Sequence, residues 1–272
     1  MIAGVPDRAV PVPATIQRIA AGRRLTLVWH NALGGQTYEM GTGAGRKFVK
    51  WTPTGSGIDL GREVARLEWA VNYVRVPRVL DRGGDEHGTW IVTACLPGEN
   101  AVTDRWKADP ATAVAAIGGG LRAVHDALPV DACPFSWSVE DRLVGTRRLA
   151  ALGRLDPASW DPIHRQLGTV RALEVLASPP PIDRLVVCHG DACSPNTLLT
   201  DDGCWSGHVD LDQLGVADRW ADLAVATWST QWNYGPGWED ALLDAYGIAP
   251  DAERTRYYRL LWDADAPAPH EG

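Results

Sequence analysis

The chain has 272 residues, enough for one large domain or two moderate ones, and 45% of them are hydrophobic, which suffices for a proper core. A formal net charge of -8 argues against nucleic acid as a partner, because proteins that bind it carry basic patches. No apolar run is long enough to span a bilayer, so no membrane partner is expected.

The first predicted elements are two strands joined by a turn that contains a pair of glycines. Strands are expected at residues 25–30 and from Thr37 onward, and Gly34, Gly35 and Gln36 lie between them. The backbone N–H groups of such a hairpin can cover phosphates. A glycine pair is weak evidence by itself, because turns use glycine for positive φ whatever they bind.

A lysine and a glutamate lie on the next two predicted elements. Residues 46–51 are typical of a strand and contain Lys50, and residues 60–70 are typical of an amphipathic helix and contain Glu63. Such a pair can meet at the α- and β-phosphates of a nucleotide. The alternative is that both are solvated surface charges, which is the usual fate of these residue types.

An apolar strand at residues 89–96 is stopped by Pro97 and Gly98, which mark a hinge. The hinge predicts a strand-rich, nucleotide-binding lobe at residues 1–97 and a mainly helical lobe, catalytic and substrate-binding, at residues 98–272. Helices are expected in the second lobe at residues 111–127, 139–152, 167–177, 217–228, 238–246 and 252–262.

The most informative stretch is H-G-D-x-x-x-x-N at residues 189–196, held between short apolar strands. Phosphoryl transfer requires a carboxylate that orients the attacking hydroxyl and accepts its proton, together with oxygen ligands for Mg²⁺. Asp191 fits the first role and Asn196 the second. The alternative is that both are ordinary turn residues, since Asp and Asn favour loops.

A second motif weakens that alternative. After a turn at residues 201–203, an alternating apolar stretch at residues 205–211 carries Asp210. A β-hairpin would bring this carboxylate back beside the first loop, so Asp210 is predicted as a second magnesium ligand. His208 is interpreted as structural.

These motifs resemble those of the aminoglycoside phosphotransferases, antibiotic-resistance kinases that share the protein-kinase fold. V-C-H-G-D-A-C-S-P-N and V-D-L-D-Q-L-G-V-A-D-R-W-A-D-L-A match the family pattern, and the similarity extends over nearly the whole chain. The resemblance implies an α+β, bilobal, protein-kinase-like fold that uses ATP and Mg²⁺. It implies that Asp191 is the catalytic base, that Asn196 and Asp210 bind magnesium, and that Lys50 and Glu63 pair at the phosphates.

The resemblance also assigns nucleotide contacts that are made by the backbone and that side chains therefore do not reveal. Gly34, Gly35 and Gln36 would cover the phosphates, and the backbone of Cys95 and Leu96 would hydrogen-bond the purine edge.

For the substrate, the resemblance makes Asp161 and Asp263 the candidate carboxylates, and the acidic balance of the chain would attract a polycation. Two residues depart from the family pattern: Asp212 stands where most members have glycine, and Gln213 where many have arginine. The second change puts in doubt a basic contact toward the substrate pocket. The following Asp218, Arg219 and Asp222 are interpreted as an ion-pair network that opens a helix.

The sequence therefore predicts a kinase that phosphorylates an aminoglycoside, with the 3′-hydroxyl preferred because Y-Y-R-L-L at residues 257–261 resembles the 3′ group. The near alternative is the 3″-hydroxyl of streptomycin, and the more distant ones are a kinase of a sugar, choline or an amino alcohol, and a catalytically silent nucleotide-binding protein. A silent relative would be expected to have lost Lys50, Asp191, Asn196 or Asp210, and all four are present.

Five cysteines without zinc-finger spacing favour a reducing cytoplasm, and a monomer or weak dimer is expected.

Overall fold

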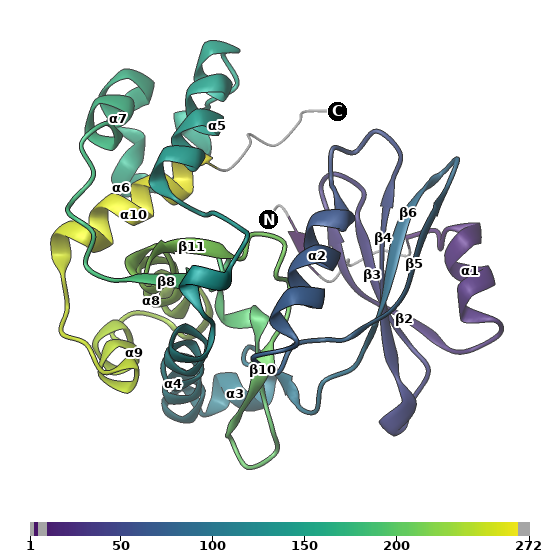
Figure 1. Cartoon of the computed structure of the whole chain (residues 1–272). Coiled ribbons are helices and arrows are strands. Elements are labelled where there is room, and N and C mark those ends of the chain that lie inside the picture. The colour runs from purple at the N-terminus through teal and green to yellow at the C-terminus, as the bar shows by residue number, and fades with distance from the viewer. Residues whose placement is uncertain (1–2, 5–9, 266–272) are drawn as a thin grey trace. The chain divides into compact units, whose positions relative to one another are not determined.

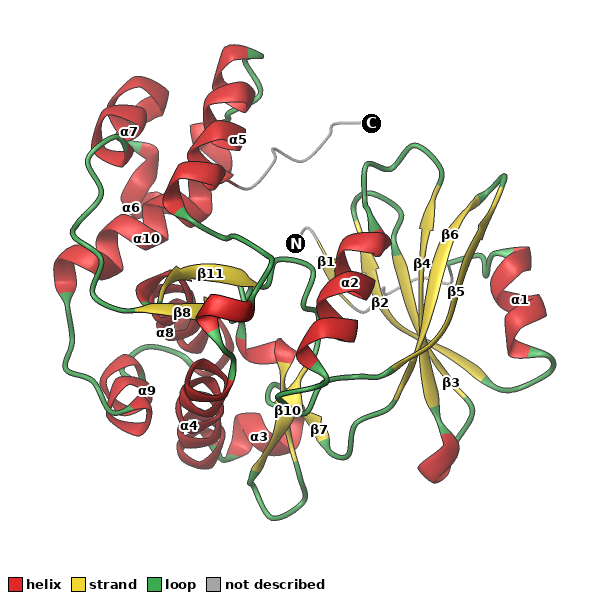
Figure 2. Ribbon diagram, in the orientation of Figure 1, coloured by secondary structure: helices red, strands yellow, loops and turns green. Residues whose placement is uncertain are grey.

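The computed structural model describes residues 3–4 and 10–265, which divide into two compact units. The first unit comprises residues up to Asn72 and Val76–Leu96, and the second comprises Tyr73–Arg75 and the residues from Pro97 onward. Figure 2 shows that the first unit is built on a large sheet and that helices predominate in the second. The predicted α+β fold is confirmed.

The first unit contains a six-stranded antiparallel sheet in the order β1-β2-β3-β4-β6-β5. Its strands are β1 (Ala3–Gly4), β2 (Leu25–Asn31), β3 (Gln36–Met40), β4 (Lys47–Pro53), β5 (Val79–Asp85) and β6 (Gly88–Ala94). Its helices are α1 (Ala14–Ala20) and α2 (Leu60–Ala70), with a short 3₁₀ turn at Gly43–Gly45.

The two helices pack on opposite faces of this sheet (Figure 1). Successive residues of a strand point to opposite faces, so Val49 and Lys50 of β4 are directed toward different helices. Val49 packs with Ile16 of α1, whereas Ile91 of β6 packs with Val64 of α2. Lys50 pairs directly opposite Ile91 and therefore lies on the face that α2 covers.

The sequence did not predict α1 and β5. Ile16 of α1 is completely buried against the sheet, a tertiary contact that stabilises a helix too short to form alone. The strand β5 contains Gly83 and Gly84, which weaken a strand pattern. A Cβ at Gly83 would lie 2.4 Å from the indole ring of Trp90, so packing of that ring across the hairpin requires the glycine.

The second unit combines two small sheets, ordered β10-β9-β7 and β11-β8, with eight α-helices among its described residues. Its strands are β7 (Glu99–Asn100), β8 (Leu185–Cys188), β9 (Thr197–Leu199), β10 (Trp205–His208) and β11 (Gly215–Asp218). Its helices are α3 (Asp104–Ala108), α4 (Pro110–Ala127), α5 (Val139–Ala151), α6 (Pro162–Arg165), α7 (Gly168–Leu176), α8 (Trp220–Tyr234), α9 (Glu239–Tyr246) and α10 (Ala252–Asp265).

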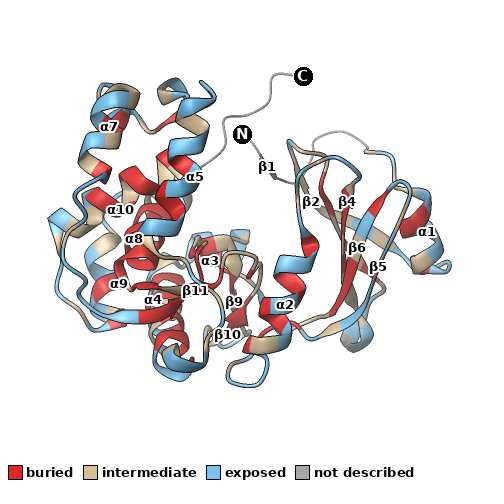
Figure 3. Ribbon diagram, turned by 45° about the horizontal axis from the view of Figure 1, so that its top comes forward, coloured by how far each residue is buried: buried red, intermediate tan, exposed pale blue. Residues whose placement is uncertain are grey.

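The helix α8 is the centre of this unit. All of its residues from Trp220 to Thr230 are buried, and Figure 3 shows them enclosed by neighbouring elements. A helix that is apolar or small on every side, as W-A-D-L-A-V-A-T-W-S-T is, can only be stable in a core. Across the described residues, no helix combines the length and apolarity needed to cross a membrane.

One predicted helix is wrong at both ends, and it continues past residue 228 to Tyr234. The helix expected at residues 217–228 begins instead at Trp220, because Ala217 and Asp218 end the strand β11, which pairs antiparallel with β8. The Asp218 side chain then accepts a hydrogen bond from the backbone N–H of Trp220 at 2.9 Å and caps the new helix. The start of α8 is thereby fixed beside the strand that leads into residues 189–196.

Candidate active site

In the first unit, Lys50 and Glu63 form an ion pair. The Lys50 Nζ atom lies 2.7 Å from Glu63 Oε1, and the Glu63 side chain is only 5% exposed. Glu63 is in the first turn of α2, whose N-terminus is capped by the side chain of Asp59. The register of β4 opposite Ile91 and the burial of one face of α2 therefore bring the two charges together, as the sequence predicted.

In the second unit, residues 189–196 form a loop between β8 and β9, and side chains within the loop bind one another. Asn196 Nδ2 donates hydrogen bonds to the backbone oxygen and to Oδ2 of Asp191, both at 3.0 Å. The Asp191 N–H donates to Nδ1 of His189 at 3.2 Å, and Nε2 of His189 donates to the carbonyl of Val209 at 2.9 Å. His189 thus joins the loop to the residue that precedes Asp210.

The expected β-hairpin between β9 and β10 is present, with His208 paired opposite Thr197. Beyond its end, the Val209 N–H donates to the carbonyl of Asn196 at 3.0 Å. Asp210 follows with φ of +66°, a left-handed conformation that is uncommon for residues other than glycine and that often marks a functional position. The predicted proximity of Asp210 to the first loop is therefore observed.

The carboxyl of Asp191 lies in an unfavourable environment for a negative charge. Removal from water raises the pKa of Asp191 above its usual range, and the charge of Asp210 raises it further. The buried Oδ1 atom of Asp191 accepts no hydrogen bond from the described part of the chain. Such an atom is expected where a bound molecule supplies the donor.

The side chain of Asp222, on α8, holds the backbone of this loop in place. The sequence did not predict this contact. Asp222 accepts hydrogen bonds from the backbone N–H groups of His189 at 2.6 Å and Gly190 at 2.9 Å. Burial alone would raise the pKa of Asp222, but these bonds and that of His125 hold it below its usual value. The ionised carboxylate thus fixes the backbone immediately before Asp191.

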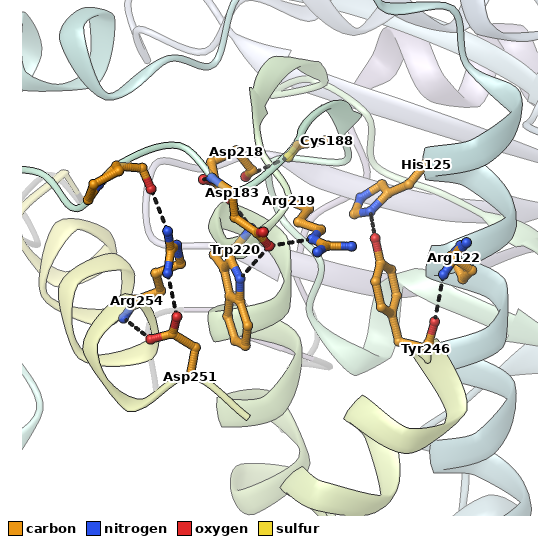
Figure 4. A network of polar contacts seen from close by, with 11 residues as sticks. Arg122, His125, Asp183, Cys188, Asp218, Arg219, Trp220, Tyr246, Asp251 and Arg254 are labelled. Atoms are coloured by element: carbon orange, nitrogen blue, oxygen red, sulfur yellow. Dashed lines mark hydrogen bonds and ion pairs between the residues drawn. The ribbon is translucent and has the colours of Figure 1, made fainter. Parts of the chain in front are cut away.

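Asp222 is in turn held in place by His125, which is bound to Tyr246. His125 of α4 donates from Nε2 to Asp222 at 2.9 Å, and its Nδ1 is hydrogen-bonded to Tyr246 of α9 at 2.9 Å (Figure 4). Burial raises the pKa of Tyr246 to about 12, so its hydroxyl keeps its proton and can donate it. Cys188 also lies near His125 and Asp222, but the Asp222 carboxylate already accepts three N–H bonds, and we assign this cluster to anchoring.

The backbone at Gly190 requires glycine. Its φ is +86°, and a Cβ there would lie 2.4 Å from the carbonyl oxygen of Gln213. The loop that carries Asp191 and the segment that follows Asp210 therefore touch through their backbones. The Cβ of Gln213 also lies in this contact, 2.6 Å from where a Cβ at Gly190 would be.

Asp218, Arg219 and Asp222 do not form the one ion-pair network that the sequence predicted, because each binds residues outside this group. Arg219 pairs with Asp183 at 2.6 Å, whereas Asp218 accepts the backbone N–H of Asp183 and caps α8 (Figure 4). Asp222 pairs with His125 and the catalytic loop instead. The spacing of these residues predicts a helix start, but it contains no information about partners so distant in sequence.

The predicted nucleotide contacts lie in the first unit. Gly34 and Gly35 occupy the turn between β2 and β3, where Asn31 Oδ1 accepts the Gly35 N–H at 2.8 Å, and Gln36 begins β3. Cys95 and Leu96 follow the last residue of β6, and the Cys95 thiol donates to the Leu96 carbonyl at 3.0 Å. Their backbone positions are fixed, and their roles remain predictions.

The two predicted substrate carboxylates are neighbours in the second unit. Asp263 of α10 accepts the backbone N–H of Asp161 at 3.1 Å and a hydrogen bond from His164 Nδ1 at 2.6 Å. Asp161 caps the short helix α6, where its side chain accepts the N–H of Ile163. The fold therefore joins two acids that are about a hundred residues apart in sequence into one acidic pair.

These features together define a kinase-type phosphotransferase: one unit carries a Lys–Glu pair on a strand and helix, and the other carries an Asp–Asn loop followed by a second Asp. The chain belongs to the phosphotransferase enzyme family, whose sequence model matches residues 30–258.

Individual relatives are similar over most of their length. An aminoglycoside 3′-phosphotransferase of Streptomyces fradiae is 35% identical, over 79% of this chain and 83% of the relative. A streptomycin 3″-kinase of Streptomyces griseus is 34% identical over the same shares. The solved structure of an aminoglycoside phosphotransferase from Streptomyces rimosus, in complex with ADP and streptomycin, has a TM-score of 0.73 and 27% identity over 93% of this chain and 97% of that one. Sequence identity thus does not separate the 3′ from the 3″ class.

Proposed function

We propose that this protein transfers the γ-phosphoryl group of ATP to a hydroxyl of an aminoglycoside, with the 3′-hydroxyl preferred. The proposal rests on the hydrogen bonding of the two carboxylate oxygens of Asp191. One of its carboxylate oxygens is held by Asn196, while the buried Oδ1 has no donor within the described chain. A substrate hydroxyl supplies the missing donor and is thereby oriented for attack.

In this mechanism Asp191 orients the hydroxyl and accepts its proton at Oδ1. The raised pKa makes Asp191 a stronger base than an ordinary aspartate, yet the group is ionised once the pH exceeds that pKa. Asn196 holds the other oxygen, and Asp222 holds the backbone on the N-terminal side. The base therefore has little freedom to turn away from the hydroxyl.

Asn196 and Asp210 are the residues we propose for Mg²⁺. Both N–H groups of the Asn196 amide are used by Asp191, so its Oδ1 atom is the part of the amide left to bind a cation. With the Asp210 carboxylate this gives two hard oxygen donors, the kind that Mg²⁺ prefers, and a cation would relieve repulsion between the two aspartates. When bound, the metal neutralises charge on the phosphates.

For the nucleotide, we propose that Lys50 pairs with the α- and β-phosphates while Glu63 orients its ammonium group. The turn at Gly34, Gly35 and Gln36 would offer backbone N–H groups to the phosphates. The backbone of Cys95 and Leu96 would bind the purine edge. The Lys50–Glu63 distance of 2.7 Å supports the first of these roles.

Replacing Lys50 with alanine is expected to raise KM for ATP and to lower kcat/KM by at least about tenfold, since a charge-assisted contact to phosphate is lost. It also removes the ammonium group that lies 2.7 Å from the buried Glu63 carboxylate. Steady-state kinetics with varied ATP provide the measurement.

Lys47→Ala is the matched control, because Lys47 lies on the same strand but its side chain points to the opposite face. Equal effects of the two substitutions, or a Lys50→Ala enzyme with the ATP kinetics of the wild type, would remove Lys50 from the nucleotide site.

The acidic pair Asp161 and Asp263 supports a polycationic substrate. Two neighbouring carboxylates can pair with ammonium groups of an antibiotic, and the net charge of -8 attracts a polycation over longer range. We place the reaction in the cytoplasm, where ATP is available and where five free cysteines stay reduced, and propose a monomer or weak dimer.

The test is a phosphate-transfer assay with a panel of purified compounds. Kanamycin or neomycin is expected to be phosphorylated at the 3′-hydroxyl, with the position determined by NMR. Because carboxylates would hold the ammonium groups, KM for the antibiotic should rise with salt more than KM for a neutral sugar. Asp263→Asn should raise KM for the antibiotic but not for ATP.

Streptomycin is the second candidate, favoured by the likeness to the 3″-kinase and to the streptomycin complex. Phosphorylation of streptomycin alone would assign the 3″ class. Efficient phosphorylation of choline or a simple sugar, with none of any aminoglycoside, would overturn the proposal.

A further inference from the structure

Trp232 is an exception on the most buried helix of the second unit. The residues of α8 from Trp220 to Thr230 are buried, yet Trp232, in the last turn of the helix, is 51% exposed. Its ring packs at an interplanar angle of 40° against that of Trp228, which is only 4% exposed, with a centroid distance of 5.0 Å. The inner ring thus holds the outer one in place, and the outer ring presents a face to solvent.

The position of Trp232 on the helix places it next to the catalytic loop. At about 100° per residue, Trp232 projects between Trp228 and Ser229, about 40° from the first and about 60° from the second. Ser229 accepts a hydrogen bond from the backbone N–H of Ser194 at 2.9 Å, and Ser194 is in the loop that carries Asp191. One side of the exposed indole is therefore directed toward the helix position that binds the loop carrying Asp191.

The other side adjoins the acidic pair. The ring of Trp228 packs edge-on against His164, with centroids 5.7 Å apart, and His164 is hydrogen-bonded to Asp263 at 2.6 Å. Asp161 is bound to the same carboxylate through its backbone. An exposed aromatic ring thus lies between the loop of the proposed base and two carboxylates, all within the second unit.

We infer that Trp232 is a specificity-determining residue: its indole face packs against a ring of the aminoglycoside while Asp161 and Asp263 pair with the ammonium groups. This inference rests on the proposed function and defines the substrate as an amino sugar with both an apolar C–H face and flanking cations. Such a face stacks on an indole, and an ammonium group beside it gains cation–π attraction. A neutral, flexible amino alcohol would gain little from the same surface.

The test compares Trp232→Ala and Trp232→Phe with the wild type, using the antibiotic that the wild type phosphorylates best. Trp232→Ala should raise KM and the calorimetric Kd for that antibiotic by about three- to tenfold, with KM for ATP unchanged. Trp232→Phe, which keeps a ring, should lose less. The melting temperature of each variant shows that it is folded.

Trp29→Ala is the matched control, because Trp29 is 40% exposed but lies on β2 of the first unit. An antibiotic KM that stays at the wild-type value in Trp232→Ala overturns the inference alone, as does an equal rise for ATP or an equal rise in Trp29→Ala. Absence of aminoglycoside turnover by the wild type overturns the proposed function, and the inference falls with it.

Discussion

Replacing Asp191 with alanine is expected to lower kcat by at least about 10² while leaving the affinity for ATP nearly unchanged. The substitution removes the oxygen that accepts the proton and leaves the Asn196 amide with only its hydrogen bond to the backbone oxygen at position 191. Steady-state kinetics and nucleotide titration give the two quantities. Asp202→Ala is the control, since Asp202 is an exposed acid in the turn between β9 and β10. Turnover near the wild-type rate would exclude Asp191 as the base.

Replacing Asp191 with asparagine should raise the free energy of unfolding, although it removes the proposed base. The folded protein raises the pKa of Asp191, so the ionised carboxylate opposes folding. This destabilisation is absent below about pH 4 and complete above the raised pKa. The neutral variant should therefore be more stable than the wild type at pH 7 when metal is chelated, and the difference should vanish in acid. Urea denaturation at several pH values measures it.

Asp222→Asn is expected to lower the free energy of unfolding at pH 7 by about 3 kcal/mol or more and to reduce kcat strongly. Asp222 and His125 are both fully buried, and the carboxylate accepts three hydrogen bonds, two of them from the catalytic loop. The folded state lowers the pKa of Asp222, so the wild-type advantage is present above the ordinary pKa and is lost as the pH falls. The pH dependence is thus opposite to that of Asp191→Asn.

A smaller effect is expected from Tyr246→Phe, which removes the hydroxyl that binds His125 and also interacts with Arg219, but leaves the Asp222 carboxylate and its three hydrogen bonds. Tyr257→Phe is its matched control, because the Tyr257 hydroxyl is also buried and binds the carbonyl of Leu176 at 2.9 Å, away from this network. If Asp222→Asn unfolded at the same urea concentration as the wild type, the anchoring role would be wrong.

The sequence predicted the hairpin between β9 and β10 correctly because the information is local. Residues 189–196 and the strands around them lie within about two dozen positions of one another, and the glycine-containing turn sets their register. The strand β11 was missed for the opposite reason. The strand G-V-A-D is short, and its Ala217 and Asp218 continue into the apolar and small residues of the following helix, so only pairing with β8, some thirty residues earlier, makes it a strand.

The anchor of the loop could not be predicted from the sequence on physical grounds. His125 and Asp222 are 97 residues apart, and each is a polar residue at a buried position of its helix, where most of the other buried residues are apolar or small. A buried charge must have a partner, so a polar residue at a core position of a helix indicates that a partner exists. Which partner it is depends on how α4, α8 and the loop pack.

The helix α8 has an implication for how such an enzyme can evolve. Its first turn holds Asp222 in the core, where almost any replacement costs the stability that every variant needs. Its last turn holds Trp232 at the surface, where replacement costs little stability and alters what the ring can touch. On the proposal that Trp232 contacts the antibiotic, mutations that shift the antibiotic range are expected at the C-terminal end of this helix, whereas few replacements of Asp222 are expected to be tolerated at its other end.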